Sequence, residues 1–438
     1  MKKSIPNKGG THMAFPKKTW GIITCLLLTA ALSFLIFLLF PHDKEASWKE
    51  QIKTESLTAK YNGKQSKSVR LTSEFVTASM NFGLDMLNYE ANVEKQKNVL
   101  VSPASALFAL GMTGNGTDGE TRKEFEQVLG DGLSMEELSK SYSTLLQQYK
   151  KVPSEKLVVA NSIWLKASGT SVLPSFLETN ARYFGQDIYS APSLNDAKDD
   201  INFWVSRRTN GLIPRLYNPE HIIDDSTFMI LINTIYFHME WEQKFDKAST
   251  TKASFFPAPG QEISALMMNC CETVKYLEHD GAIGILKPYK DENFIFLAVL
   301  PPQEQTPEEY LKSLSGQEFL EKLRRASPKE ISLTMPKFTL EFEANLNKFL
   351  RDAGMETAFS GGDFTQMCPG GLAQIDNVIQ KTYIELDEEG TEAAAVTAVE
   401  VGSSISSIPQ ITLDRPFLYG ILDDKNYFPL FLGILNQP

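Results

Sequence analysis

The chain has 438 residues, of which 42% are hydrophobic and 22% are charged, and its formal net charge is −11. This composition is typical of a globular protein with an extensive core, and it excludes a disordered or fibrous chain. The acidic balance, which deepens once the basic N-terminus is set aside, excludes a nucleic-acid-binding surface. We therefore expect the partners to be proteins.

The N-terminal forty residues predict a membrane anchor. Residues 1–19 contain five lysines and no acid, and residues 20–40 carry no charge. At ~1.5 Å per residue, a helix of about 21 residues spans the ~30 Å hydrocarbon core of a bilayer. The alternative is a cleaved signal peptide, but its apolar part would be shorter, and small residues would follow it instead of Phe-Leu-Leu-Phe-Pro.

We therefore expect a cytoplasmic basic segment (1–19) and a single transmembrane signal anchor (20–40) with its N-terminus inside. The remainder is then extracytoplasmic or extracellular, and it is secreted if the anchor is cleaved. Residues 41–70 are rich in Lys, Ser, Gln and Glu, which predicts a polar stalk. A core-like pattern begins at Leu71, so the folded domain is expected over residues 71–438.

Capping residues predict where the first helices begin. A cap at Thr72 or Ser73 precedes apolar residues at helical spacing, namely Phe75, Phe82 and Met86. After a short strand, Ser102 is suited to cap a second helix, with Pro103 in its first turn. Thr117 and Glu120 have the spacing of a capping box for a third helix.

The glycines at 114, 116 and 119 have the spacing of a dinucleotide-binding loop. That loop requires a preceding strand, whereas here a helix is predicted, so we interpret the segment as a helix–turn–helix connection.

Further along the chain, helical and strand patterns are mixed. Residues 201–205, with Thr209 and Gly211, are typical of a helix end, and residues 228–237 and 293–300 read as buried strands. Because no regular βαβ rhythm is present, the fold class expected is α+β.

The cysteines and histidines favour neither a disulfide framework nor an enzyme. Of four cysteines, Cys25 lies in the apolar span, and one bridge from Cys368 to Cys270 or Cys271 stays open. A thiol or metal site built from Cys270, Cys271, His279 and Asp280 would match no ligand spacing, and neither His-Glu-x-x-His nor Gly-x-Ser-x-Gly occurs. We expect no metal, no cofactor and no catalytic residue.

Side-chain alternation predicts a long strand followed by an unusual loop. Residues 378–386 alternate with one more apolar face, and Glu388, Glu389 and Gly390 end the strand, with Gly390 as a flexible joint. Beyond it, Glu392 and Glu400 lie on one face, and the other face is small or β-branched and uncharged: Thr391, Ala393, Ala395, Thr397, Val399 and Val401. The loop is therefore suited to enter a sheet as a strand.

Several separate segments, in their order and spacing, resemble the serpins, a family of serine protease inhibitors. They are residues 98–107 with Ser-Pro-x-Ser, 201–211, 233–245 with Trp241 and Phe245, Met-Pro-Lys-Phe at 335–338, 346–359, 387–395, and Arg-Pro-Phe-Leu at 415–418. The resemblance covers residues 71–438 and suggests a membrane-anchored, prokaryotic-like member. It implies three β-sheets, about nine helices and an exposed reactive-centre loop in a monomer prone to loop–sheet polymers.

The resemblance also implies a mechanism. A protease cleaves the loop, stays attached as an acyl-enzyme, and is carried away as the freed loop inserts into the central sheet. Counting from Gly390 places the cleaved bond between Ser404 and Ile405, whereas counting back from Pro416 places it between Ile405 and Ser406. Since residues 401–406 contain no Arg, Lys or aromatic residue, an elastase-like or subtilisin-like serine protease is the expected target.

Three groups of site residues follow from the resemblance. Hinge and insertion residues are Glu388, Glu389, Gly390, Thr391, Ala393, Ala394, Ala395 and Thr397. Trp241 and Lys337 lie where the loop enters the sheet, with Lys337 paired to Glu388. The cluster beneath the sheet is Ser102, Ser105, Asn233 and Gln380.

Two positions depart from the family pattern. Gln380 stands where the family has His, and since it cannot titrate, we expect sheet opening to depend little on pH. Val396 replaces a smaller residue. A non-inhibitory serpin-like binding or structural protein is the alternative function, and the intact small residues from Thr391 to Ala395 favour an inhibitor.

Overall fold

The computed structural model describes residues 48–49, 51–61, 65–167, 171–185, 187–290, 293–370, 373–391 and 408–438. The expected anchor (20–40) and the expected cleavage site lie outside these residues. Within the described ranges, no helix combines the length and apolarity that a membrane crossing needs. The chain divides into two compact units, Met1–Lys53 and Thr54–Pro438, and the second holds the elements from β1 to β17.

Nine α-helices occur in the described part of the chain. They are α3 (Ser73–Val93), α4 (Pro103–Gly114), α5 (Gly119–Gly130), α6 (Met135–Tyr149), α7 (Pro174–Tyr183), α8 (Lys198–Arg208), α9 (Pro307–Lys312), α10 (Gly316–Arg325) and α11 (Asn347–Asp352). Two short 3₁₀ helices, η1 (Lys247–Ser249) and η2 (Thr357–Phe359), accompany them.

The helix starts at Thr72 and Ser102 are confirmed. The Thr72 side chain accepts a hydrogen bond from the amide of Phe75, and that of Ser102 accepts one from the amide of Ser105. The capping box at Thr117 is wrong. The neighbouring Asp118 caps α5, and the Thr117 hydroxyl instead donates to the carbonyl of Gly114 in the preceding helix.

A six-stranded sheet runs through the centre of the folded unit. Its order is β1 (Glu55–Ser56), β4 (Asp187–Ala191), β3 (Leu157–Lys166), β5 (Met229–Phe237), β13 (Asn377–Leu386) and β12 (Phe338–Asn345). Alternate residues of β13 are buried, as predicted: Val378, Gln380, Thr382, Ile384 and Leu386. One face of this strand therefore packs into the core.

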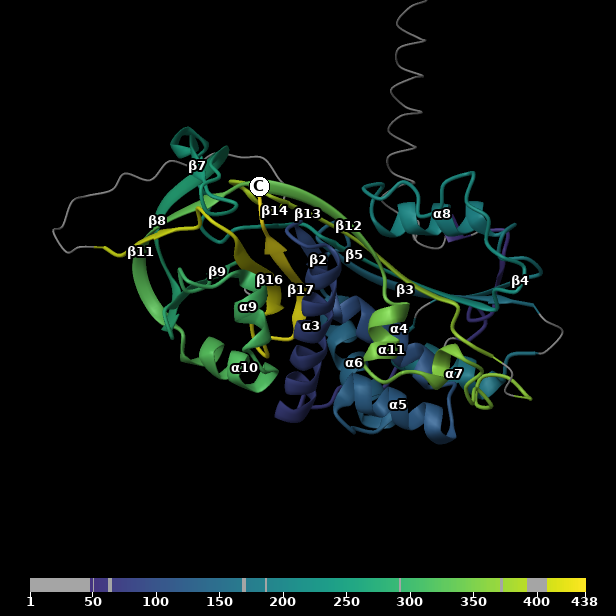
Figure 1. Cartoon of the computed structure of the whole chain (residues 1–438). Coiled ribbons are helices and arrows are strands. Elements are labelled where there is room, and N and C mark those ends of the chain that lie inside the picture. The colour runs from purple at the N-terminus through teal and green to yellow at the C-terminus, as the bar shows by residue number, and fades with distance from the viewer. Residues whose placement is uncertain are drawn as a thin grey trace, which may run out of the picture. The chain divides into compact units, whose positions relative to one another are not determined.

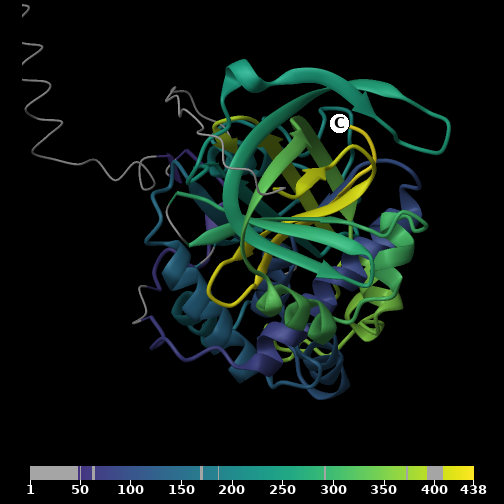
Figure 2. The ribbon, with the colours of Figure 1, turned by 90° about the vertical axis from the view of Figure 1, so that its left-hand side faces the viewer.

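The other strands form a nine-stranded sheet and a short pair. The larger sheet comprises β15 (Gln410–Thr412), β11 (Ser327–Pro336), β8 (Ile263–His279), β9 (Ala282–Pro288), β10 (Phe294–Leu300), β16 (Phe417–Asp423), β17 (Pro429–Leu435) and β2 (Val99–Val101), with β7 (Thr251–Phe255) beside β8. The pair is β6 (Met239–Glu240) with β14 (Gly390–Thr391). Figure 2 shows the curved teal and green strands of the larger sheet together with its yellow strands near the C-terminus.

Helices cover both faces of the six-stranded sheet. In Figure 1, α4 lies below β3 and β5, and α8 lies on the opposite side of the sheet. Strand β5 is buried along its whole length, because α4 and α8 pack on its two faces. Separate helices and mixed sheets confirm the predicted α+β class.

The folded unit begins earlier than the boundary predicted at Leu71. Glu55 and Ser56 pair with β4 at the edge of the sheet, and the amide of Thr54 donates to Asp200 Oδ2 at 2.7 Å. The second part of the expected stalk is thus packed on the domain. Edge pairing uses backbone groups and needs few apolar side chains, so a polar composition concealed it.

Candidate functional site

The six-stranded sheet is open at one end between its two central strands. β13 pairs with β12 over its length, but it pairs with β5 only where residues 377–381 meet residues 230–234. Beyond Lys381 and Thr234, the described residues supply no further ladder between these two strands. The two strands therefore diverge beyond this point in the part of the chain that the structure describes.

A tight turn at residues 387–389 lies at the mouth of this opening. After it, Gly390 and Thr391 form β14, which runs antiparallel to β6, with Gly390 opposite Glu240. A Cβ added at Gly390 would lie 2.6 Å from the Cα of Glu240, and its φ of +152° also disfavours other residues. The sequence suggested a flexible joint at Gly390, and the structure shows that the close approach of two backbones also requires glycine.

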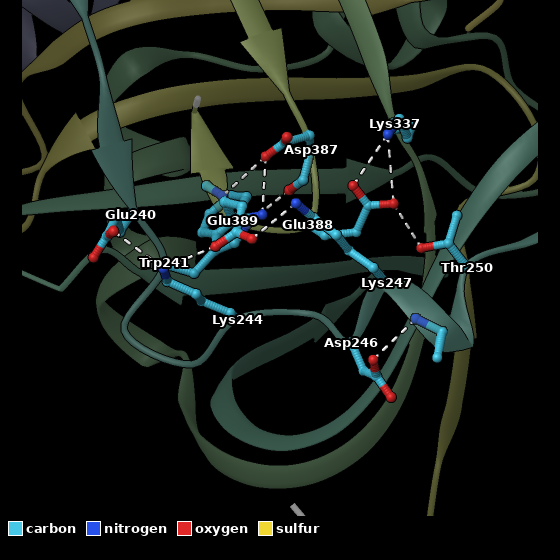
Figure 3. A network of polar contacts seen from close by, with 12 residues as sticks. Glu240, Trp241, Lys244, Asp246, Lys247, Thr250, Lys337, Asp387, Glu388 and Glu389 are labelled. Carbon is cyan, nitrogen blue, oxygen red and sulfur yellow. Dashed lines mark hydrogen bonds and ion pairs between the residues drawn. The ribbon is translucent and has the colours of Figure 1, made fainter. Parts of the chain in front are cut away.

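Glu388 forms the predicted pair with Lys337. Its Oε2 lies 3.1 Å from Lys337 Nζ, and its Oε1 accepts a hydrogen bond from the Thr250 hydroxyl at 2.8 Å (Figure 3). Burial by itself raises the pKa of Glu388, but the hydrogen bonds from Thr250 and Lys337 and the charge of Lys337 outweigh it, so the pKa lies below its ordinary value. Glu388 is thus held as a carboxylate although it is buried.

Glu389 is buried too, and two lysines bind it. Lys244 Nζ lies 2.8 Å from Oε2 and Lys247 Nζ lies 3.0 Å from Oε1. The hydrogen bond to Glu389 raises the pKa of both lysines. The two hinge acids therefore point to separate cationic partners, as Figure 3 shows.

Trp241 holds the turn from the adjacent strand. Its indole Nε1 donates to the carbonyl of Asp387 at 2.9 Å, and its backbone amide donates to the carbonyl of Glu389 at 2.9 Å. The amide of Phe245 donates to the carbonyl of Glu388 at 2.9 Å. Trp241 is fully buried and stacks on Tyr289, with ring centroids 4.7 Å apart. Trp241 and Lys337 therefore both contact the hinge turn at residues 387–389.

Gln380 occupies the closed end of the opening. Its Nε2 donates to Asn233 Oδ1 at 3.0 Å and to the carbonyl of Ser102 at 2.8 Å, and its Oε1 accepts from the Ser102 amide at 2.8 Å. Gln380 therefore contacts two other members of the predicted cluster, Asn233 and Ser102. Gln380 joins β13 to β5 and to the start of α4.

Ser105, the fourth residue of this predicted cluster, contributes differently. Its backbone amide donates to Ser102 Oγ, but its hydroxyl is buried and makes no hydrogen bond with any described residue, and the same is true of Asn233 Nδ2. The four residues lie together, and their part in sheet opening stays a prediction.

The remaining predicted residues fall outside the described part of the chain. These are Ala393, Ala394, Ala395 and Thr397 of the hinge, with Ser404, Ile405 and Ser406 at the cleavage site. Thr391 is described as a strand residue only.

Three partners of the hinge acids and a buried ion pair were missed from the sequence. Thr250, Lys244 and Lys247 lie far from residue 388 in the chain, and nothing in their local pattern distinguishes them. The pair Lys287–Glu272, with Nζ 2.5 Å from Oε1, is almost completely buried. The sequence did carry a signal for this ion pair, because Lys287 is a charged residue within the otherwise apolar strand β9.

The hypothetical thiol or metal site is not assembled. Cys270 and Cys271 lie in the middle of β8, and His279 lies at its end, roughly 26–30 Å further along the strand at ~3.3 Å per residue. Cys270, Cys271 and Cys368 are all free, so the bridge that was left open does not form. Among the described residues, no group of His, Cys, Asp and Glu is placed to hold a metal ion.

Comparisons with known proteins agree with this architecture. The family model described as "Serpin (serine protease inhibitor)" matches residues 77–438. The leukocyte elastase inhibitor of Homo sapiens is 30% identical over 381 residues, which cover 83% of this chain and 99% of that protein.

Two solved structures extend the comparison. Tengpin, a thermophilic serpin in the native state, superposes with a TM-score of 0.81 and 32% identity, covering 88% of this chain and all of that one. Human thyroxine-binding globulin with bound ligand gives a TM-score of 0.75 and 25% identity over 84% of this chain and 99% of that one. The chain therefore belongs to the serpin family.

Proposed function

We propose that this protein is a suicide-substrate inhibitor of serine proteases, which traps the acyl-enzyme by inserting its cleaved loop between β5 and β13. Protease inhibition is supported by the family and by the leukocyte elastase inhibitor among its relatives. The observation that carries the proposal is the open end of the sheet, at which β14 already pairs with β6.

The register of β14 supports a particular course of insertion. Continued in the same antiparallel register, Ala393 would lie opposite Phe237 and Ala395 opposite Ile235. These small side chains can enter without steric conflict, and an inserted strand would form backbone ladders with both β5 and β13. Residue 396 would then face Thr234, which is already paired with Lys381. Further insertion would require the five residue pairs that still join β5 to β13 to separate. The hydrogen bond from Gln380 to Asn233 would break at the same time.

The target would be an elastase-like or subtilisin-like protease with a pocket for small or aliphatic side chains. Support comes from residues 401–406, which contain only Val, Gly, Ser and Ile, and from the similarity to an elastase inhibitor. The cleaved bond would be Ser404–Ile405 or Ile405–Ser406. N-terminal sequencing of the fragment released from the complex would decide between them.

We also propose that residues 20–40 anchor the protein, with the inhibitory domain on the outer side of the membrane. The uncharged span and the preceding lysines support this arrangement. Accessibility of the domain to an added protease in intact cells would test it.

The decisive experiment mixes the purified full chain with elastase-like and subtilisin-like proteases. An SDS-resistant complex with the mass of protease plus inhibitor is expected, because the acyl bond is covalent. Ala395→Glu is the matched control. It places a charge on the face that would be buried, so the loop should be cleaved without a complex.

A small-molecule carrier is the second candidate, favoured by the similarity to thyroxine-binding globulin. Such a protein would be cleaved by every protease without forming a complex, and that result would replace the inhibitor proposal. The small residues from Thr391 to Ala395 favour the inhibitor, since a carrier has no need to insert its loop.

A further inference from the structure

A buried ammonium group lies directly beneath the segment that holds the hinge. Lys287, in β9, is completely buried, and its Nζ lies 2.5 Å from Glu272 Oε1 in β8. The same Nζ donates to the carbonyl of Gln243 at 2.7 Å. It also lies 5.2 Å from the ring centroid of Trp241 and 4.8 Å from that of Phe245. Lys287 therefore contacts every second residue of the segment 241–245.

Two of the residues that Lys287 contacts, Trp241 and Phe245, bind the hinge. The amides of Trp241 and Phe245 donate to the carbonyls of Glu389 and Glu388, and the indole of Trp241 donates to that of Asp387. Three hydrogen bonds to the turn thus depend on where the segment 241–245 sits. Lys287 contacts that segment through a carbonyl and two aromatic rings.

A charged pair is a costly way to fill this space. Moving an ammonium and a carboxylate out of water is unfavourable, and well-packed apolar side chains of similar volume usually stabilise a fold as well or better. What an apolar side chain cannot supply is a donor for the Gln243 carbonyl and attraction to both rings. Glu272 provides the countercharge, and the thiol of Cys270 donates to it at 3.2 Å.

We propose that Lys287, held by Glu272, is a positioning residue that fixes segment 241–245 as the dock for the hinge. This keeps β14 paired with β6 at the mouth of the opening, so that insertion starts promptly after cleavage. The consequence for inhibition rests on the proposed function, whereas the effect on the hinge itself does not.

A matched control exists elsewhere in the fold. Arg208 Nη2 lies 2.8 Å from Asp187 Oδ2, which also accepts a hydrogen bond from the indole of Trp204 at 2.9 Å. This is likewise a buried ion pair in contact with a buried tryptophan, but it joins α8 to β4. Replacing it removes the same kinds of interaction without touching segment 241–245.

The test compares Glu272→Met/Lys287→Met with Asp187→Leu/Arg208→Met in the full chain. Hydrogen exchange at the amides of Trp241 and Phe245 should become about tenfold faster in the first variant, the factor expected from losing a hydrogen bond to a charged group. The moles of inhibitor consumed per protease trapped should rise as well. The thermal midpoint of the Glu272→Met/Lys287→Met variant should stay at or above that of the wild type. Faster exchange would then reflect a change in the position of the hinge and not a loss of stability.

Further variants keep the test decisive. Glu272→Gln leaves the buried Lys287 ammonium without its countercharge, so it should also exchange faster than the wild type. Glu272→Ala/Lys287→Leu replaces the Met pair if that variant does not fold. Unchanged exchange in the apolar variant, or an equal change in the Arg208 control, overturns the inference. If the wild type traps no protease, the proposed function fails, and the exchange measurement still decides whether Lys287 positions the hinge.

Discussion

The two ends of the opening between β5 and β13 are held by different kinds of interaction. At the hinge, Glu388 and Glu389 are held by lysines whose side chains are partly exposed. At the far end, Gln380 joins Asn233 and Ser102 through neutral hydrogen bonds that are fully buried. The comparison suggests that the hinge end responds to pH and charge reversal, whereas the Gln380 end responds only to the loss of hydrogen-bonding groups.

The location of each end explains why the hinge end uses ion pairs and the Gln380 end uses neutral hydrogen bonds. When the hinge moves, its lysines can be hydrated, so breaking those pairs costs little. A charge at position 380 would be left in a dry core when the sheet opens, which is expensive. A neutral amide is therefore suited to a buried contact that has to break and reform.

The largest effect is expected from Glu388→Lys. A lysine at this buried position faces Lys337 without a partner, which should destabilise the hinge by roughly 3 kcal/mol and promote loop–sheet polymers on heating. Native electrophoresis after heating measures the polymers. Adding Lys337→Glu should restore the monomer, and Glu341→Lys, in a half-exposed pair with Lys381, is the surface control. If the Glu388→Lys protein stays monomeric on heating, the ion pairs at the hinge do not control polymer formation.

Gln380→Leu should have the next largest effect. The amide of Ser102 and Asn233 Oδ1 would lose their partner in the core, at about 1–3 kcal/mol for each buried group left unpaired. Urea denaturation should show the loss. Lys381→Met, its neighbour on the other face, should cost less than about 1 kcal/mol, since it breaks an ion pair with the exposed Glu341. Equal losses in the two variants would contradict the assignment of Gln380 as a buried lock.

Acid should weaken the hinge end. The pKa of Glu388 in the fold lies below its ordinary value of 4.5, so the pair with Lys337 is intact above pH 4.5 and is lost as the pH falls through the lower folded value. Polymer formation should therefore rise below about pH 4.5. Because Glu388→Gln cannot titrate, its polymerisation should lack this component. A wild-type curve with the same acid dependence as the variant would mean that another group is responsible.

The smallest effect is expected at the Gln380 end near neutral pH. The rate of loop insertion should show no step between about pH 6 and 7 from this cluster, whereas Gln380→His should introduce one.

A second group titrates in the same range and has to be removed from this measurement. Burial first, and then the charge of Glu94, raise the pKa of Glu90 in α3 to about 7. Because this value lies above that of the unfolded chain, stability falls as the pH rises from about 4.5 through 7. The insertion rates of the protein that keeps Gln380 and of its Gln380→His variant should therefore both be measured in a Glu90→Gln background. A step between about pH 6 and 7 in the protein that keeps Gln380 would contradict the prediction.

Patterns within a few residues predicted local structure well. The caps at Thr72 and Ser102 and the alternation in β13 were correct, because each depends on neighbouring residues. The capping box at Thr117 failed because Asp118, one residue later, caps more strongly. The boundary at Leu71 failed because the pairing of β1 depends on backbone groups that composition does not register.

The sequence by itself determined the family and the α+β class, and the family resemblance that it carries predicted the pair of Lys337 with Glu388. The suitability of the loop for insertion stays a prediction. Only the tertiary structure decided that Lys244 and Lys247 bind Glu389, that Gln380 contacts both Asn233 and Ser102, and that Lys287 lies beneath Trp241. The reason is physical. Periodicity and capping reflect forces between near neighbours, whereas these contacts join residues that meet only when distant strands pair, and their burial sets the strength of each charge.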